Sequence, residues 1–60
     1  MSKTKILEQI LKRRHEIANK MIPYKVSIEY GKPTKEEISL YALLNDELVF
    51  LDQLILDFKA

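Results

Sequence analysis

The chain has sixty residues, no cysteine, a net charge of only +1 and 47% hydrophobic residues, which is typical of one small folded domain and excludes a disulfide framework. A cysteine-free chain fits a reducing, cytoplasmic compartment. No apolar run approaches the roughly 20 residues of a membrane span, so no membrane contact is expected. A domain of this size buries only about 60% of the surface that its unfolded chain exposes, so we expect support from self-association or a protein partner.

The charges are unevenly distributed along the chain. Residues 1–35 hold nine Lys or Arg against three Glu, a balance of +6. Residues 36–60 hold one Lys against six Asp or Glu, a balance of −5. The two halves therefore attract each other, within one chain or between copies, although each exposed ion pair stabilises by only ~0–1 kcal/mol.

The first predicted element is an amphipathic helix over about residues 4–21. Its hydrophobic residues recur at i, i+3, i+4 and i+7, which is the spacing of one helix face. Ser2 or Thr4 is placed to cap its start. Pro23 is expected to end it, because the residue before a proline is pushed out of the α region.

The next segment, residues 24–30, changes to a period of two. Tyr24, Val26, Ile28 and Tyr30 alternate with polar residues, which is the pattern of a half-buried strand. A lone strand leaves its backbone donors and acceptors unpaired, so a strand here would pair with a second copy or with a partner. The alternative is an extended connector whose hydrophobic side chains lie across the helices.

A capping box begins the second helix, which is expected over about residues 35–58. In Thr34-Lys-Glu-Glu37 the Thr34 hydroxyl accepts a hydrogen bond from the amide of Glu37, whose carboxylate reaches back to the amide of Thr34. Gly31 and Pro33 before it form a turn. At 1.5 Å per residue the helix would be ~36 Å long. Its hydrophobic residues cover more of its circumference than one neighbouring helix can bury.

These elements predict a mainly α fold, a two-helix antiparallel hairpin with a short extended segment between the helices. It is expected to occupy residues 1–60 as a single domain and to be oligomeric, most simply a two-fold dimer. In the expected core, residues of the second helix pack on the first: Leu48, Leu51 and Ile55 on Ile10, Ile17 and Met21. The surplus hydrophobic surface is the expected interaction surface. It comprises Leu40, Leu43, Phe50 and Leu54, together with Val26 and Ile28.

The sequence lacks the patterns of a catalytic, metal or cofactor site. His15 is the only histidine, and neither the i+3 nor the i+4 position from it carries a metal-ligand type. The single glycine excludes a glycine-rich phosphate loop, and the serines lie in ordinary contexts without an activating base. We therefore predict a non-enzymatic chain that needs no cofactor.

The basic run Lys12-Arg13-Arg14 is the strongest candidate for contact with an anion. Consecutive helix residues spread around the circumference, and an acidic second helix would repel phosphate, so nucleic-acid binding is only an alternative. The other interpretation is a solubilising segment that pairs with carboxylates. Asp52 is then a candidate partner of Arg13 or Arg14 across the helices.

The C-terminal run Leu51-Asp52-Gln53-Leu54-Ile55-Leu56-Asp57-Phe58 resembles the end of the short sporulation-type aspartyl-phosphate phosphatases of Gram-positive bacteria. Those proteins are helical hairpins of about this length that act on response regulators. The likeness is strict over eight residues only, and the preceding residues 48–50 and the segment 24–30 depart from the family. The resemblance implies that Asp52 enters the phosphorylation site of a partner protein.

The favoured interpretation is a small non-enzymatic regulator, inhibitor or assembly factor, of a kind that phages and mobile elements carry. It would act through the hydrophobic face of its second helix or through the edge of segment 24–30. The alternatives are a response-regulator phosphatase that uses Asp52 and a nucleic-acid-binding protein that uses the basic run.

Overall fold

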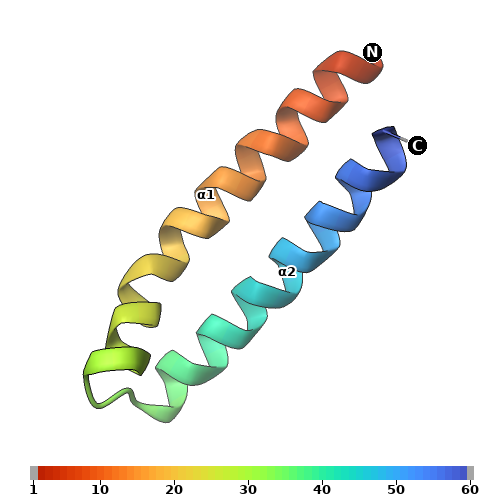
Figure 1. Cartoon of the computed structure of the whole chain (residues 1–60). Helices are drawn as coiled ribbons and strands as arrows, with labels where there is room; N and C mark the ends of the chain where they lie inside the picture. Colours follow the sequence, from red (N-terminus) through yellow and green to blue (C-terminus); the bar gives the residue numbers. More distant parts are fainter. Residues whose placement is uncertain (1, 60) are drawn as a thin grey trace.

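The computed structural model describes residues 2–59, which form two α-helices joined by a short loop (Figure 1). Helix α1 spans Lys3–Tyr30 and helix α2 spans Lys35–Lys59. The helices lie side by side and antiparallel, so the first turn of α1 and the last turn of α2 are at the same end (Figure 1). The predicted mainly α hairpin is confirmed. Residues 1 and 60 of the predicted domain lie outside the described residues.

The hairpin is long and thin. Its principal extents are 44 × 15 × 15 Å, and its radius of gyration is 13.9 Å. A compact domain of sixty residues has a radius of gyration of roughly 10 Å. Its accessible surface of 4870 Å² likewise exceeds the roughly 4,100 Å² expected of a folded chain of this mass. Two helices share only one line of contact, so the buried side chains form a single row along that line and not a globular core.

Segment 24–30 is helical, so the strand and the extended connector predicted for it are both wrong. Helix α1 continues through it to Tyr30 and is capped by Gly31, whose N–H donates to the carbonyl oxygen of Ser27 at 2.9 Å. In a helix each N–H finds an acceptor in its own segment, whereas a single strand finds no neighbouring strand anywhere in residues 2–59. The segment is therefore helical despite its period-two pattern, because only a helix gives its backbone N–H and C=O groups hydrogen-bond partners.

Pro23 lies inside α1 and does not end it, contrary to the prediction. Its ring removes the N–H that would donate to the carbonyl of Asn19 and crowds that carbonyl, which strains a helix without necessarily breaking it. Figure 1 shows the last turns of α1, drawn in yellow-green to green, bent relative to the turns before them. A bend of this kind is the usual response of a helix to an internal proline.

The core lies along the line where the two helices meet. Ile17 is fully buried, and Met21, Leu51 and Ile55 are nearly so. The residues packed around the buried cluster are Ile10, Tyr41, Leu44, Leu48 and Leu54. The six residues of the predicted core are all buried or packed against this cluster, so the predicted core is confirmed.

Local hydrogen bonds set the starts of both helices. The Ser2 side chain accepts from the amide of Lys5 at 3.3 Å, so Ser2 rather than Thr4 caps α1. The predicted capping box of α2 is present. The Glu37 amide donates to the Thr34 hydroxyl, and the Thr34 amide donates to the Glu37 carboxylate, each at 3.1 Å.

We expect the hairpin to lose stability at acid pH, because protonation of Glu37 weakens the capping box. The backbone N–H of Thr34, helped by the side chain of Ser27, lowers the pKa of the Glu37 carboxyl below its ordinary value of 4.5. The contribution of Glu37 is therefore complete above pH 4.5 and is lost as the pH falls through the lower pKa of the folded state. Urea unfolding at a series of pH values measures this loss.

The variant Glu37→Gln should show a shallower fall in stability at acid pH than the parent chain. Glu36→Gln is the matched control, because Glu36 is an exposed carboxylate in the same turn that lies outside the capping box. It should keep the parent's pH dependence. Equal pH profiles for Glu37→Gln and the parent would contradict the capping box in solution.

Candidate protein-interaction surface

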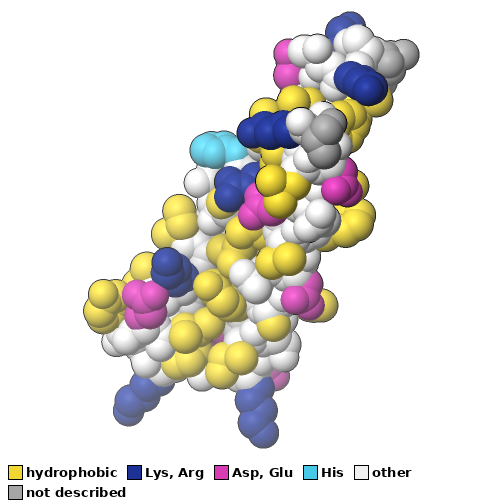
Figure 2. Space-filling model, turned by 45° about the vertical axis from the view of Figure 1, so that its right-hand side comes forward, with side chains coloured by type: hydrophobic (Ala, Val, Ile, Leu, Met, Phe, Trp, Pro, Cys, Tyr) yellow, Lys and Arg dark blue, Asp and Glu magenta, His cyan; other side chains and the backbone are white. Residues whose placement is uncertain are grey.

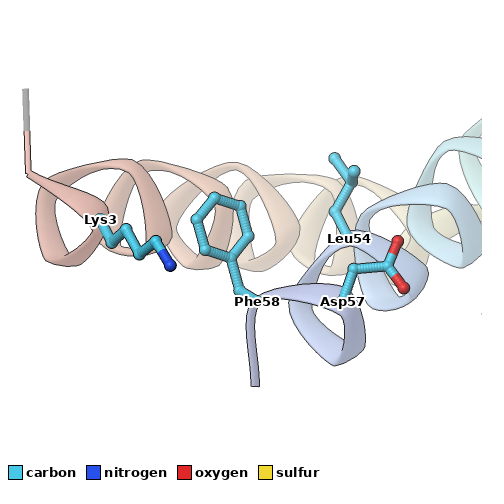
Figure 3. A pocket seen from close by; sticks show the side chains of 4 residues that line it. All are labelled: Lys3, Leu54, Asp57 and Phe58. Carbon is cyan, nitrogen blue, oxygen red and sulfur yellow. The ribbon is translucent and has the colours of Figure 1, made fainter. Parts of the chain in front are cut away.

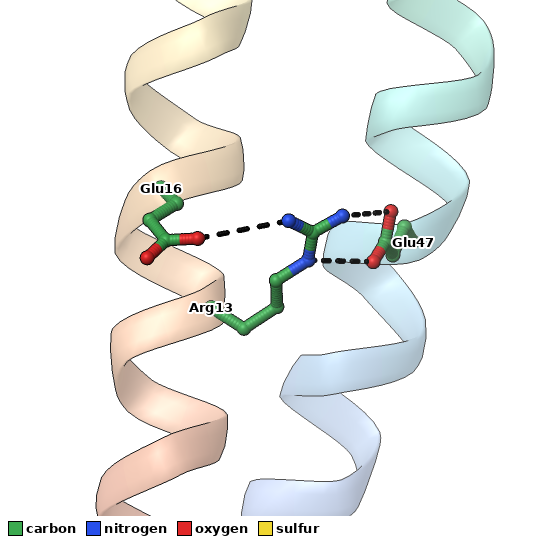
Figure 4. Close-up of polar contacts among 3 residues, drawn as sticks. All are labelled: Arg13, Glu16 and Glu47. Atoms are coloured by element: carbon green, nitrogen blue, oxygen red, sulfur yellow. Dashed lines mark hydrogen bonds and ion pairs between the residues drawn. The ribbon is translucent and has the colours of Figure 1, made fainter.

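Two ion pairs connect the helices on opposite sides of the core. The Arg13 guanidinium donates to both carboxylate oxygens of Glu47, at 3.0 and 3.4 Å, and lies 3.6 Å from Glu16 of its own helix (Figure 4). The Arg14 guanidinium donates to the carboxylate of Asp52. Adjacent helix residues point to different sides, so the two arginines form ion pairs with α2 on the two sides of the core. The predicted pairing of this basic run with carboxylates across the helices is confirmed.

These ion pairs change what the basic run can offer to an anion. The hydrogen bond and the charge of Glu47 raise the pKa of the Arg13 guanidinium, and this pairing occupies part of its hydrogen-bonding capacity. Arg14 is engaged by Asp52, and Lys12 is exposed. The three side chains do not form one basic face. Nucleic-acid binding by this run stays a prediction, as does the phosphatase role that the resemblance implies for Asp52.

A hydrophobic row on α2 lies on the Arg13–Glu47 side of the core, and we name it the α2 stripe. Leu43 is 65% exposed and Phe50 is 61% exposed, whereas Leu54 is partly buried against the core. The spacing of these residues keeps them on one side of α2. The α2 stripe consists of Leu40, Leu43, Phe50 and Leu54, the four residues of the predicted interaction surface that lie on α2.

Val26 and Ile28, the other two residues of the predicted surface, do not join the α2 stripe. Both lie on α1 and both are exposed. Because residues two apart in a helix point to nearly opposite sides, they do not share a face, as they would have in a strand. The predicted six-residue surface is therefore divided between the two helices.

Acidic residues border the α2 stripe. Asp46 lies three residues after Leu43 and four before Phe50, so it is a neighbour of both on the helix surface. At the open end of the hairpin the stripe runs into a shallow hollow lined by Lys3, Leu54, Asp57 and Phe58. Figure 3 shows the Phe58 ring between the Lys3 side chain and the Asp57 carboxylate. The stripe is thus an apolar row with a negatively charged margin.

A second apolar surface lies on the Arg14–Asp52 side of the core and draws on both helices. A furrow runs between the helices there, lined by Ala18, Met21, Ile22, Lys25, Tyr41, Asn45 and Leu48. Exposed hydrophobic side chains of both helices flank this furrow, because they lie three, four, seven or eight residues from the residues that line it. Figure 2 shows such side chains on both helices and in the hollow between them. We name the set Leu11, Ala18, Ile22, Ile38, Val49 and Leu56 the two-helix face.

The two-helix face was not predicted from the sequence. Its signal is an alternating spacing of four and three residues that runs through Ala42, Asn45, Val49, Asp52 and Leu56. Polar Asn45 and Asp52 interrupt the row, so it does not stand out as hydrophobic. The furrow also needs the matching row of α1, which only the packing of the hairpin brings beside it.

Metal-ligand clusters and membrane-spanning helices are both absent from the described residues. Residues 2–59 contain no group of three or more His, Asp or Glu side chains placed to hold a metal ion. Within the same residues, neither helix is long and apolar enough to cross a membrane. Comparison of the chain with protein-family models, with curated proteins and with solved structures finds no match in any of the three.

Proposed function

We propose that this chain is a small protein-interaction module that binds a helical partner through the α2 stripe. The observation that carries the proposal is the exposure of Leu43 and Phe50 on a helix whose core-facing row is already occupied by Leu51 and Ile55. Burial of each such side chain contributes up to about 1.5–3 kcal/mol, before the entropic costs of association are subtracted. A row of this kind on a small, thin domain is typical of an interaction surface.

The partner that fits the α2 stripe is an amphipathic helix with basic flanks. A row spaced by three, seven and four residues accepts a second helix through side chains of matching spacing. Helix α2 carries six Asp or Glu against two Lys, and Asp46 and Asp57 border the stripe. Basic residues on the partner would therefore speed its approach and orient it on the stripe.

Two substitutions of matched exposure test which side of the hairpin the partner occupies. Phe50 on the α2 stripe and Leu56 on the two-helix face are 61% and 62% exposed. Phe50→Asp places a carboxylate at the centre of the stripe and should abolish co-purification of the partner from cells that express the chain. Leu56→Asp introduces the same charge on the other side and should leave co-purification intact.

A photo-reactive side chain gives a direct readout of the same surface. Placed at position 50 it should cross-link to one protein, whereas at exposed position 53 it should not. Circular dichroism checks that every variant keeps its helix content. Recovery of the same partner with Phe50→Asp, or equal cross-linking from positions 50 and 53, would contradict the assignment of the stripe.

A further inference from the structure

We infer that the two-helix face is a homodimer interface, at which two hairpins form a four-helix bundle around the two Arg14–Asp52 ion pairs. This inference does not rest on the partner proposed above, because it concerns the opposite side of the core. Four contributions support it: the surface area, the composition of the face, the charges of the helices and the register of the side chains.

The accessible surface of the single hairpin exceeds that of a compact chain by about the area that one ordinary interface buries on each partner. The chain exposes 4870 Å², roughly 800 Å² more than a compact chain of its mass. A stable protein–protein interface takes about 800 Å² from each partner. Covering one long side of the hairpin with a second copy would therefore bring the chain to the exposure of a compact protein.

The two-helix face has the composition of a bundle interior, which the side with the α2 stripe lacks. Leu11 and Ile22 of α1 and Val49 and Leu56 of α2 are exposed on its two banks, and small Ala18 lets a helix approach closely. On the other side only α2 is apolar, because α1 presents polar residues such as Arg13 and Glu16 there. A pair of helices accepts a second pair most readily where both present hydrophobic side chains.

The charges of the helices select one arrangement of the two copies. Helix α1 carries seven Lys or Arg against three Glu, and α2 carries two Lys against six Asp or Glu. A two-fold axis parallel to the helices puts each α1 beside the α2 of the second copy, with the loops at the same end. A two-fold axis across the helices would instead put the two basic helices together and the two acidic helices together. Neighbouring helices run antiparallel in both arrangements, so the charges decide, and the parallel axis is favoured because it places each basic helix beside an acidic one.

The register of the side chains agrees with this arrangement. Rotation about an axis along the hairpin keeps every residue at its own height, so heights can be counted from the Arg14–Asp52 pair. Leu11, three residues before Arg14, then lies at the height of Leu56, four residues after Asp52. In the same way Ala18 lies near the height of Val49. Leu11 and Ala18 of one copy thus face Leu56 and Val49 of the other, on the two sides of the Arg14–Asp52 pair.

The Arg14–Asp52 pairs of the two copies form one layer at the centre of such a bundle. Each Arg14 comes within reach of its own Asp52 and of the Asp52 of the second copy, so two positive and two negative charges balance. A buried charge is costly unless it is paired, so the layer favours this register over any shifted one. A single polar layer in an apolar seam is a known means of fixing register and oligomer state.

Sedimentation equilibrium of the full chain over a wide concentration range tests the inference. The expected result is a dimer of the 7.1 kDa chain. Leu56→Asp, and Val49→Asp as a second variant of the same face, should weaken the dimer at least tenfold while circular dichroism shows retained helix. Phe50→Asp, of matched exposure on the opposite side, should dimerise like the parent. A folded monomer at all concentrations, or dimers that tolerate both face variants, would overturn the inference.

Exchange of the central charges tests the layer itself. In the central layer Arg14→Asp gives each copy two acidic side chains, and Asp52→Arg gives each copy two basic ones. Like charges then face each other in the homodimer, so each variant alone should dimerise at least tenfold more weakly than the parent. An equimolar mixture should form a heterodimer, because every acid then faces a base. Failure of the mixture to associate would overturn the central layer.

The direction of the second copy is measured with one spin label per chain. The chain has no cysteine, so Lys32→Cys in the loop offers a unique attachment point. Loops at the same end place the two labels much closer than the 44 Å length of the hairpin. A short distance between the labels supports the parallel axis. A distance near the full length would overturn the proposed arrangement in favour of the axis across the helices.

Discussion

Leu51→Ala is expected to remove most of the stability of the hairpin. Leu51 is only 7% exposed and belongs to the buried cluster with Ile17 and Met21. Truncation of a buried leucine destabilises by about 2–5 kcal/mol, because the transfer energy is lost and a cavity remains. A single core in a domain of this size rarely supplies more than about 3–5 kcal/mol. The variant should therefore be largely unfolded at 25 °C, as urea titration followed by circular dichroism would show.

Leu43→Ala is the matched control for this prediction. It makes the same chemical change on the same helix, but Leu43 is 65% exposed and lies on the α2 stripe. Its expected effect is within about 0.5 kcal/mol of the parent. Both variants should be compared at one protein concentration, because self-association makes apparent stability depend on concentration. Equal midpoints for the two variants would contradict the position of the core.

Pro23→Ala is expected to stabilise the hairpin. Pro23 lies inside α1, where a proline is less favourable than alanine by about 3 kcal/mol because it lacks the N–H and crowds the carbonyl one turn earlier. Alanine can donate to the free carbonyl of Asn19 and restore the helix ladder. The gain should reach about 2–3 kcal/mol, measured as a shift of the urea midpoint at constant slope.

Pro33→Ala provides a control of opposite sign. Pro33 lies in the loop outside both helices, where a proline stabilises by restricting the unfolded chain. Its replacement should destabilise by about 0.4–1 kcal/mol. If Pro23→Ala were destabilising as well, the segment beyond Pro23 would not be helical in solution. The period-two pattern of residues 24–30 would then describe it better than α1 does.

Much of the hairpin could be predicted because its signals act between near neighbours. The capping box consists of hydrogen bonds between Thr34 and Glu37, three residues apart, so it does not depend on contacts with α1 to be recognised. The core rows follow from hydrophobic spacing within each helix, and the rows predicted from it lie at the helix contact. The α2 stripe was equally visible, because an excess of hydrophobic residues on one helix is a property of that helix alone.

Segment 24–30 shows where such reasoning fails. Its alternation is typical of a strand, but strand formation needs a partner, which no pattern within the segment can supply. Whether the segment is a strand or a helix therefore depends on whether another element of the fold can pair with it. Residues 2–59 contain one further element, the helix α2, so the segment satisfies its backbone hydrogen bonds within α1.

The sequence by itself determined two amphipathic helices, the turn between them, the start of α2 and the residues of the core, because each depends on neighbours within a few positions. Only the tertiary structure decided that Arg13 pairs with Glu47 and Arg14 with Asp52, since both arginines had carboxylates available across the helices. It also decided the two-helix face, where rows from α1 and α2 that are unremarkable alone become one apolar surface with a furrow. Such a surface depends on which rows meet at the helix contact, and only the packing of one helix on the other sets that.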